Sequence, residues 1–212
     1  MLAITECRDL WSLQALVFMI IFLQSSAKMS TCHSYISAAI AASLQMGLHR
    51  CELEAVNPIE RETRKRIFWT IRTMETYIVA ILGLPRTVSD DDIDQEMPLE
   101  IDDQYITKEG VLPMPDGQIS MITGFNAHTK LVQILGEIIT DVYPTKRMHK
   151  GATEKSRAYV VCDTKVRKVE KDLQHWARNL PMQLRPGADS PQELLRYLSI
   201  LVRHVRPNCL IQ

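Results

Sequence analysis

One long helical segment, with unusually complete start and stop signals, constrains the fold more than any other part of the sequence. Asn57 can cap its first turn, Pro58 suits the first helical position and Glu60 stands at the third. Gly83 permits the left-handed turn that ends a helix, and Pro85 forbids its continuation. Apolar residues recur between these signals at steps of three or four, so one face must be buried. They are Ile67, Ile71, Met74, Ile78 and Leu82.

The remainder of the chain also has helical periodicity. Further helices are expected over about residues 9–25, 30–46, 122–143, 162–180 and 190–206, and the second of these is expected to end at Gly47-Leu48. The first of these is apolar all round and is therefore expected to be central. Residues 99–120 contain prolines and glycines with weak periodicity, which predicts one long ordered or partly ordered loop. Because no alternating strand pattern is present, the predicted fold class is all-α.

Composition restricts the classes of function. Lys plus Arg and Asp plus Glu each number 25, so no net charge draws the chain to nucleic acid or to an anionic membrane. The longest apolar run, residues 15–23, is shorter than the ~20 residues that cross a bilayer. The five cysteines are widely spaced and form no C-x-x-C pair, which is typical of a reduced intracellular protein without a structural zinc site.

The acidic run 89–96 is the sharpest candidate for chemistry. As a calcium loop it fails, because Gln95 stands where the turn needs glycine and Ile101 stands where a bidentate Glu is required. Asp90, Asp91 and Asp94 fit the D-D-x-x-D pattern that holds magnesium and diphosphate in all-α isoprenoid synthases, although no second metal motif accompanies them. The structural alternative is a short helical turn that begins with acids, which the helix dipole favours.

A basic run, Arg61, Arg64, Lys65 and Arg66, occupies the first turns of the long helix. Its members are either solvated or packed against another element or domain. The run and the acids lie near opposite ends of one helix, so each is expected to find partners of its own. No nucleophile motif, phosphate loop or metal-binding histidine pair is present, and the chain is not expected to be an enzyme.

Several short motifs, in order, carry a family resemblance. They are Gly47-Leu48-His49-Arg50, then Glu62-Thr63-Arg64-Lys65-Arg66-Ile67-Phe68-Trp69, then Leu82-Gly83-Leu84-Pro85, Asp91-Asp92-Ile93-Asp94 and Met97-Pro98. Together they resemble the middle homology region of fungal transcription factors with an N-terminal binuclear zinc cluster. Residues 102–107 and 126–131 are similar to the cutinase-inducing and fatty-acid-responsive regulators of that family.

The resemblance implies a multi-helix regulatory domain, spanning 1–212 and incomplete at both ends, in a nuclear regulator of RNA polymerase II transcription. It implies that DNA is read by a zinc cluster absent from this chain, so that no cofactor is expected here and zinc only in that cluster. Implied partners are DNA through that cluster, transcriptional co-regulators and a small-molecule inducer such as a fatty acid, with no membrane.

The motif residues define a candidate regulatory corner. Its members are Gly47, Leu48, His49, Arg50, Arg64, Arg66, Trp69, Gly83, Pro85, Asp92, Asp94 and Pro98. Two other functions stay open on sequence grounds. One is a magnesium and diphosphate enzyme that uses Asp90, Asp91 and Asp94, and the other is an architectural helical scaffold.

Overall fold

The computed structural model describes residues 9–51, 57–142 and 163–185. Within them the α-helices are α1 (Leu10–Ser25), α2 (Met29–Gln45), α3 (Pro58–Leu82), α4 (Met121–Glu137) and α5 (Asp163–Asn179). Short helical turns are η1 (Asp90–Asp92), η2 (Asp103–Tyr105), η3 (Ile138–Val142) and η4 (Met182–Leu184). The all-α prediction is confirmed for these residues, in which the sole β pairing is an isolated bridge between Ile106 and Val111. The predicted helix 190–206 lies outside the described residues.

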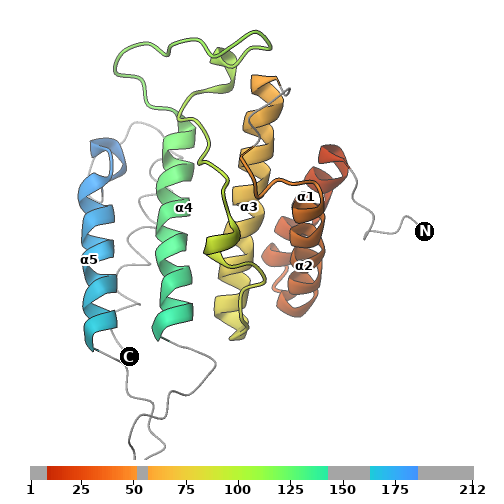
Figure 1. Cartoon of the computed structure of the whole chain (residues 1–212), viewed down its shortest axis with the longest axis vertical. Helices are drawn as coiled ribbons and strands as arrows, with labels where there is room; N and C mark the ends of the chain where they lie inside the picture. Colours follow the sequence, from red (N-terminus) through yellow and green to blue (C-terminus); the bar gives the residue numbers. More distant parts are fainter. Residues whose placement is uncertain (1–8, 52–56, 143–162, 186–212) are drawn as a thin grey trace, which may run out of the picture. The chain divides into compact units, whose positions relative to one another are not determined.

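The chain divides into two compact units, residues 1–129 and 130–212, which are described separately. The core of the first unit is made by α1, α2 and α3, which pack side by side (Figure 1). Its most deeply buried side chains come from all three helices and from the end of α2. They include Leu13, Ile20, Ile36, Ile40, Leu48, Phe68, Ile71 and Ile78.

The expectation that the first helix is central is wrong. In α1, Leu13, Leu16 and Ile20 are buried on one face, whereas large apolar side chains on the other face are exposed. A helix that is apolar all round can therefore lie at the edge of a unit, where half of its apolar surface has no partner in the described part of the chain.

The predicted ends of α2 and α3 are confirmed. Asn57 accepts a hydrogen bond from the Glu60 amide at 3.0 Å and so caps α3. Gly47 and Gly83 have φ of 71° and 67°, the left-handed conformation that glycine adopts without a Cβ clash. In each case the amide of the following leucine donates to the carbonyl five residues back, at 2.9 Å. Leu48 is buried, whereas Leu84 is partly exposed.

After α3 the chain turns back and runs along that helix towards its beginning (Figure 1). We call residues 84–103 the strap. Residues 99–120 form the predicted loop, which contains η2 and returns through Gln118 and Ser120, whose side chains donate to Asp102. The beginning of α4 joins α3 where Tyr77 Oη and His128 Nε2 lie 2.9 Å apart in a stacked, largely buried pair.

The second unit contains the end of α4, η3, α5 and η4. Leu131, Val132, Leu180 and Leu184 are buried, and Lys168 Nζ binds Glu137 Oε2 at 2.6 Å between α5 and α4. On α5 the apolar side chains of Val166, Val169, Leu173 and Trp176 recur at steps of three or four and are only partly buried. No helix in the described ranges is long and apolar enough to cross a membrane.

The two glycines that end helices differ from Gly110 in backbone conformation and not in the space around them. A Cβ at Gly47 or at Gly110 meets no atom within 4 Å, but only Gly47 has a positive φ. Gly47→Ala should therefore lower the free energy of unfolding by about 1–2 kcal/mol, measured by urea denaturation. Gly110→Ala is the matched control and should change it by less than about 1 kcal/mol. Equal effects of the two substitutions would contradict the conformational explanation.

Candidate functional site

The strap is tied to a polar face of α3 that is buried. Glu62, Lys65, Arg72 and Glu75 stand at steps of three, seven and three, and each is less than 5% exposed. Going along the strap, its partners on α3 come in reverse order, from Glu75 near the end of the helix to Glu62 near the start. A buried charge must be paired and hydrogen-bonded, so this face holds the strap in a defined register.

Arg72 lies at the centre of the first group of contacts. Its Nη1 binds Glu75 Oε2 at 2.5 Å, and its Nη2 donates to the Val88 carbonyl and to Asp90 Oδ1, both at 2.8 Å. Arg86 binds both oxygens of Asp90, at 3.0 and 2.8 Å. Partial burial would raise the pKa of Asp90, but the hydrogen bonds and charges of Arg86 and Arg72 outweigh it and hold this pKa below its usual value.

Lys65 lies at the centre of a second group. Its Nζ is 3.2 Å from Glu62 Oε1 and 2.9 Å from Glu96 Oε2. Burial alone would lower the pKa of Lys65, but Glu96 and Glu62 raise it above its usual value. The same hydrogen bond from Lys65 lowers the pKa of Glu96. The backbone is fixed at this point too, because Trp69 Nε1 donates to the Glu96 carbonyl at 2.8 Å and Glu62 accepts from the Leu99 amide at 2.8 Å.

The strap also binds the segment that follows α2. The Asp94 amide donates to the His49 carbonyl at 2.9 Å. The side-chain amide of Gln95 donates to the carbonyls of Leu48 and Arg50, at 2.8 and 2.9 Å. These bonds bring together two motifs that are more than forty residues apart in the sequence.

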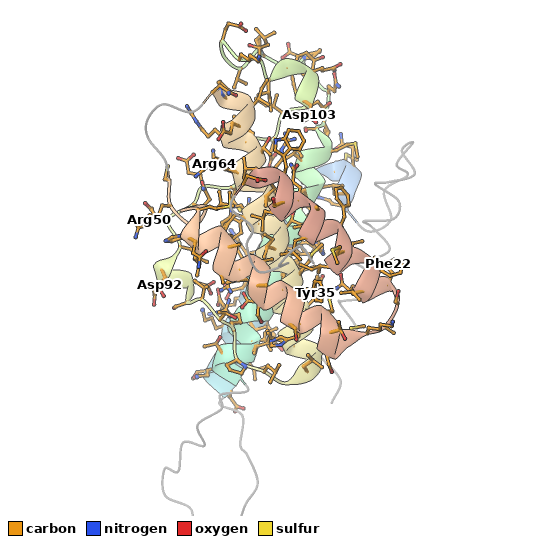
Figure 2. The ribbon with its side chains drawn as sticks, turned by 90° about the vertical axis from the view of Figure 1, so that its right-hand side faces the viewer. Phe22, Tyr35, Arg50, Arg64, Asp92 and Asp103 are labelled. Carbon is orange, nitrogen blue, oxygen red and sulfur yellow. The ribbon has the colours of Figure 1, made fainter. Side chains whose placement is uncertain are left out.

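An open cavity of about 670 Å³ lies where these segments meet. Its lining residues come from the end of α2, from the segment after it and from the strap. They are Leu44, His49, Arg50, Cys51, Thr87, Val88, Asp91, Asp92 and Asp94. Figure 2 shows Arg50 and Asp92 on the same side of the unit. The three aspartates make no ion pair with any other described residue and outnumber the one guanidinium of the lining, Arg50. The cavity therefore presents a net negative charge beside the apolar side chains of Leu44 and Val88.

The other predicted site residues are distributed unevenly around this corner. Arg64 Nη2 donates to the Met46 carbonyl at 2.9 Å, next to the Gly47 turn. Arg66 binds the exposed Asp103 and reaches the Ile101 carbonyl at the end of the strap. The Pro98 carbonyl accepts from Asn126 of α4 at 2.9 Å. Trp69 is buried and packs edge-on against Phe68.

Gly83 and Pro85 do not join the group. They stand at the end of α3, where Gly83 closes the helix and Pro85 is exposed at the beginning of the strap. Their role is to turn the chain, and that turn places the later residues of the strap against the helix.

The expectation that the basic run and the acidic run find separate partners is wrong. Lys65 of the basic run binds Glu96 of the acidic run. Arg66 binds Asp103, which follows the acidic run, and Asp90 of the acidic run binds Arg72, which follows the basic run. The physical reason is that the chain reverses after Gly83, so acids that follow the end of α3 return towards its beginning. The two alternatives for the basic run each hold for one residue. Arg61 is exposed to solvent, and Lys65 is buried against another element.

The sequence places Lys65, Gln95 and Glu96 in the charged runs, but it assigns no such role to the residues that hold the strap. They are Glu62, Lys65, Arg72, Glu75, Gln95 and Glu96. The available signal was a polar stripe on α3 with opposite charges three residues apart, at Glu62 with Lys65 and at Arg72 with Glu75. Such pairs are also common on solvated helix surfaces, so the spacing alone does not reveal burial.

The diphosphate alternative meets a specific obstacle in this arrangement. Asp90, the first acid of its motif, is occupied by two guanidinium groups, and η1 is a single short turn capped by Ser89 instead of part of a long helix. In the ranges that the structure describes, no three His, Cys, Asp or Glu side chains are placed to hold a metal ion. The arrangement is suited to binding a polar or cationic group at Asp91, Asp92 and Asp94.

Comparison with known proteins gives consistent matches. Residues 2–178 match the family described as "Fungal specific transcription factor domain". The chain is 42% identical over 190 residues to "Activator of stress genes 1" of Saccharomyces cerevisiae. The matched region covers 88% of this chain and 19% of that protein. The chain is also 40% identical over 193 residues to "Activator of stress genes protein 1" of Candida albicans, covering 86% and 20% respectively.

A more distant relative is the "ABC-transporter-regulating transcription factor" of Aspergillus fumigatus. It is 31% identical over 179 residues, covering 84% of this chain and 19% of that protein. The chain thus spans about a fifth of the length of these relatives. No solved structure was found to match it.

Removing the central guanidinium should weaken the fold strongly. Arg72→Met leaves Glu75 buried without its charge partner and should lower the free energy of unfolding by about 3–5 kcal/mol. Arg66→Met, which breaks a pair with the exposed Asp103, should cost about 1 kcal/mol or less. Urea denaturation measures both. Adding Glu75→Gln to Arg72→Met should recover part of the loss, and a double variant no more stable than Arg72→Met would contradict the explanation.

The strap should loosen in acid. The pKa of Asp90 is lower in the folded state than its ordinary value of 3.8. Its ion pairs therefore stabilise the fold fully at pH values above 3.8, and this contribution is lost as the pH falls through the pKa of the folded state. The stability difference between the wild type and Asp90→Asn should therefore be constant near neutral pH and shrink below about pH 4. Unfolding in urea at a series of pH values measures it. Asp116→Asn, an exposed change on the loop, is the control, and a difference independent of pH would contradict the assignment.

Proposed function

The chain belongs to the fungal specific transcription factor domain family, and from this premise we propose that it is the regulatory module of a longer nuclear regulator of RNA polymerase II transcription. In this proposal the module does not read DNA. DNA is bound by a zinc cluster elsewhere in the parent protein, and the module controls activity through co-regulators or an inducer. The observation that carries the proposal is the strap, which holds an open, charged cavity on a rigid helical scaffold.

The charge distribution supports a role other than DNA binding. The chain has as many acidic as basic side chains. Several of its cations, including Lys65, Arg72 and Arg86, are already bound to carboxylates of the strap or of α3. Phosphate contacts supply much of the affinity of DNA-binding proteins, and cations engaged in this way are not free to make them.

The cavity indicates the chemistry of a binding partner. Asp91, Asp92 and Asp94 disfavour an anion and favour a basic or polar group, while Leu44 and Val88 offer apolar contact. A co-regulator segment that carries a basic side chain next to an apolar one has both features. A fatty acid is an anion, as are the aspartate side chains of the cavity. The finer proposal of a fatty-acid inducer therefore requires a binding place away from this cavity.

A finer proposal concerns the target genes. Fatty-acid or cutinase genes were expected from the sequence resemblance at residues 102–107 and 126–131. The relatives reported above are named instead for stress genes and for an ABC transporter. We keep the fatty-acid proposal, and titration of the chain with a long-chain fatty acid, followed by Trp69 emission, tests it.

The regulatory proposal predicts that the cavity controls transcriptional output. In a fusion that joins a heterologous DNA-binding domain, this chain and an activation domain, Asp91→Asn with Asp92→Asn should change reporter expression by several fold. Both side chains are exposed, so the fold and the protein level should be unaffected. Asp116→Asn with Glu109→Gln, at two exposed positions of the loop 99–120, is the control with the same loss of charge elsewhere.

Two outcomes would contradict the proposal. One is a reporter output that is the same with and without the chain. The other is a cavity variant that behaves like the control at equal protein level. A measurable affinity of the isolated chain for duplex DNA, tighter than the non-specific range of about 10⁻⁴–10⁻⁶ M, would contradict the statement that the module does not read DNA.

A further inference from the structure

The exposed face of α1 is an apolar surface that the regulatory proposal does not use. Trp11, Phe18 and Phe22 are 82%, 71% and 69% exposed. Together with Ala15 they recur at steps of four, three and four, so they lie on one side of the helix. Met19 and Ile21, each 41% exposed, flank this side. The buried face of α1, with Leu13, points the other way, into the core.

The composition of this face is that of an interface core. α1 has no charged residue in its sixteen positions, and its exposed side is aromatic and aliphatic with one small residue in the middle. The centres of homodimer interfaces are depleted of charge and enriched in Trp, Phe and Met. A partner for this face needs no countercharge, which distinguishes it from the carboxylate-lined cavity.

The order of residues on this face is self-complementary. In an antiparallel pair of α1 helices related by a two-fold axis between Leu16 and Val17, Trp11 of each copy faces Phe22 of the other. In the same register, Ala15 of each copy faces Phe18 of the other, so a large side chain meets a small one at the centre. A different protein would need a separate complementary surface, whereas a second copy supplies this one by symmetry.

The area is sufficient for association. At about 150–250 Å² for each aromatic side chain, the three rings expose on the order of 450 Å² of surface. Two copies would bury on the order of 900 Å² from these rings alone, and the flanking residues bring the total close to the 1,200 Å² or so at which standard interfaces begin. Figure 2 shows Phe22 on the opposite side of the unit from Arg50 and Asp92, so pairing through α1 leaves the cavity open.

We propose that the exposed face of α1 joins two copies of this chain in an antiparallel, two-fold pair centred between Leu16 and Val17. This goes beyond the regulatory function, because it assigns an interaction surface and its partner. The pair positions two cavities on one dimeric particle, each facing away from the interface.

Sedimentation of the 212-residue chain under reducing conditions tests the proposal. The wild type should be dimeric at micromolar concentration, and Phe18→Glu should raise the dissociation constant at least about thirtyfold. Because Phe18 is exposed, this variant should keep the wild-type circular dichroism spectrum and unfolding curve. Ile81→Glu, which places the same charge on an exposed apolar residue of α3, should leave the dissociation constant unchanged.

The two-fold register has its own readout. Trp11→Lys and Phe22→Glu should each weaken the dimer, whereas the double variant should dimerise better than either, because opposite charges then meet across the interface in both places. A wild type that is monomeric up to about 100 times the expected micromolar range would overturn the proposal. So would a dimer whose dissociation constant is the same in Phe18→Glu. A dimer weakened by Phe18→Glu but not rescued by the double variant would overturn the antiparallel register.

Discussion

The buried guanidinium of Arg72 is the constraint on which the first unit depends. A charge that is only 4% exposed is tolerated only when its donors are satisfied and its charge is balanced. Its own helix supplies a single partner, Glu75, and the remaining acceptors are the Val88 carbonyl and Asp90. The chain that leaves α3 therefore has to return along the helix. Unpaired, Arg72 and Glu75 would each carry the cost of a desolvated charge.

The return of the strap organises everything that we assign to function. It places Asp94 and Gln95 against the carbonyls that follow α2, which joins the strap to the Gly47-Leu48 end of that helix. It also divides the acidic run in two. Asp90 and Glu96 form ion pairs with residues of α3, whereas the aspartates between them line an open cavity. Structural and recognition roles are thus separated by one or two positions in the sequence.

The family motifs acquire a physical meaning from these contacts. Two of these motifs meet in the structure, because Asp94 and Gln95 of the segment 91–98 donate hydrogen bonds to carbonyls of the segment 47–50. Trp69 stands between them as a buried ring whose indole N–H fixes the Glu96 carbonyl. The exposed face of α1 is separate from this arrangement, because none of its residues lines the cavity.

The sequence by itself determined the all-α class, the cap at Asn57 and the stops at Gly47 and Gly83, because these depend on local backbone and hydrogen-bond preferences. It also contained the family resemblance, which rests on the order of short motifs. Only the tertiary structure decided that the acidic run lies along α3, that Arg72 is buried and that half of α1 is exposed. The physical reason is that spacing defines the faces of a helix, whereas burial of a face depends on which distant segment returns to cover it.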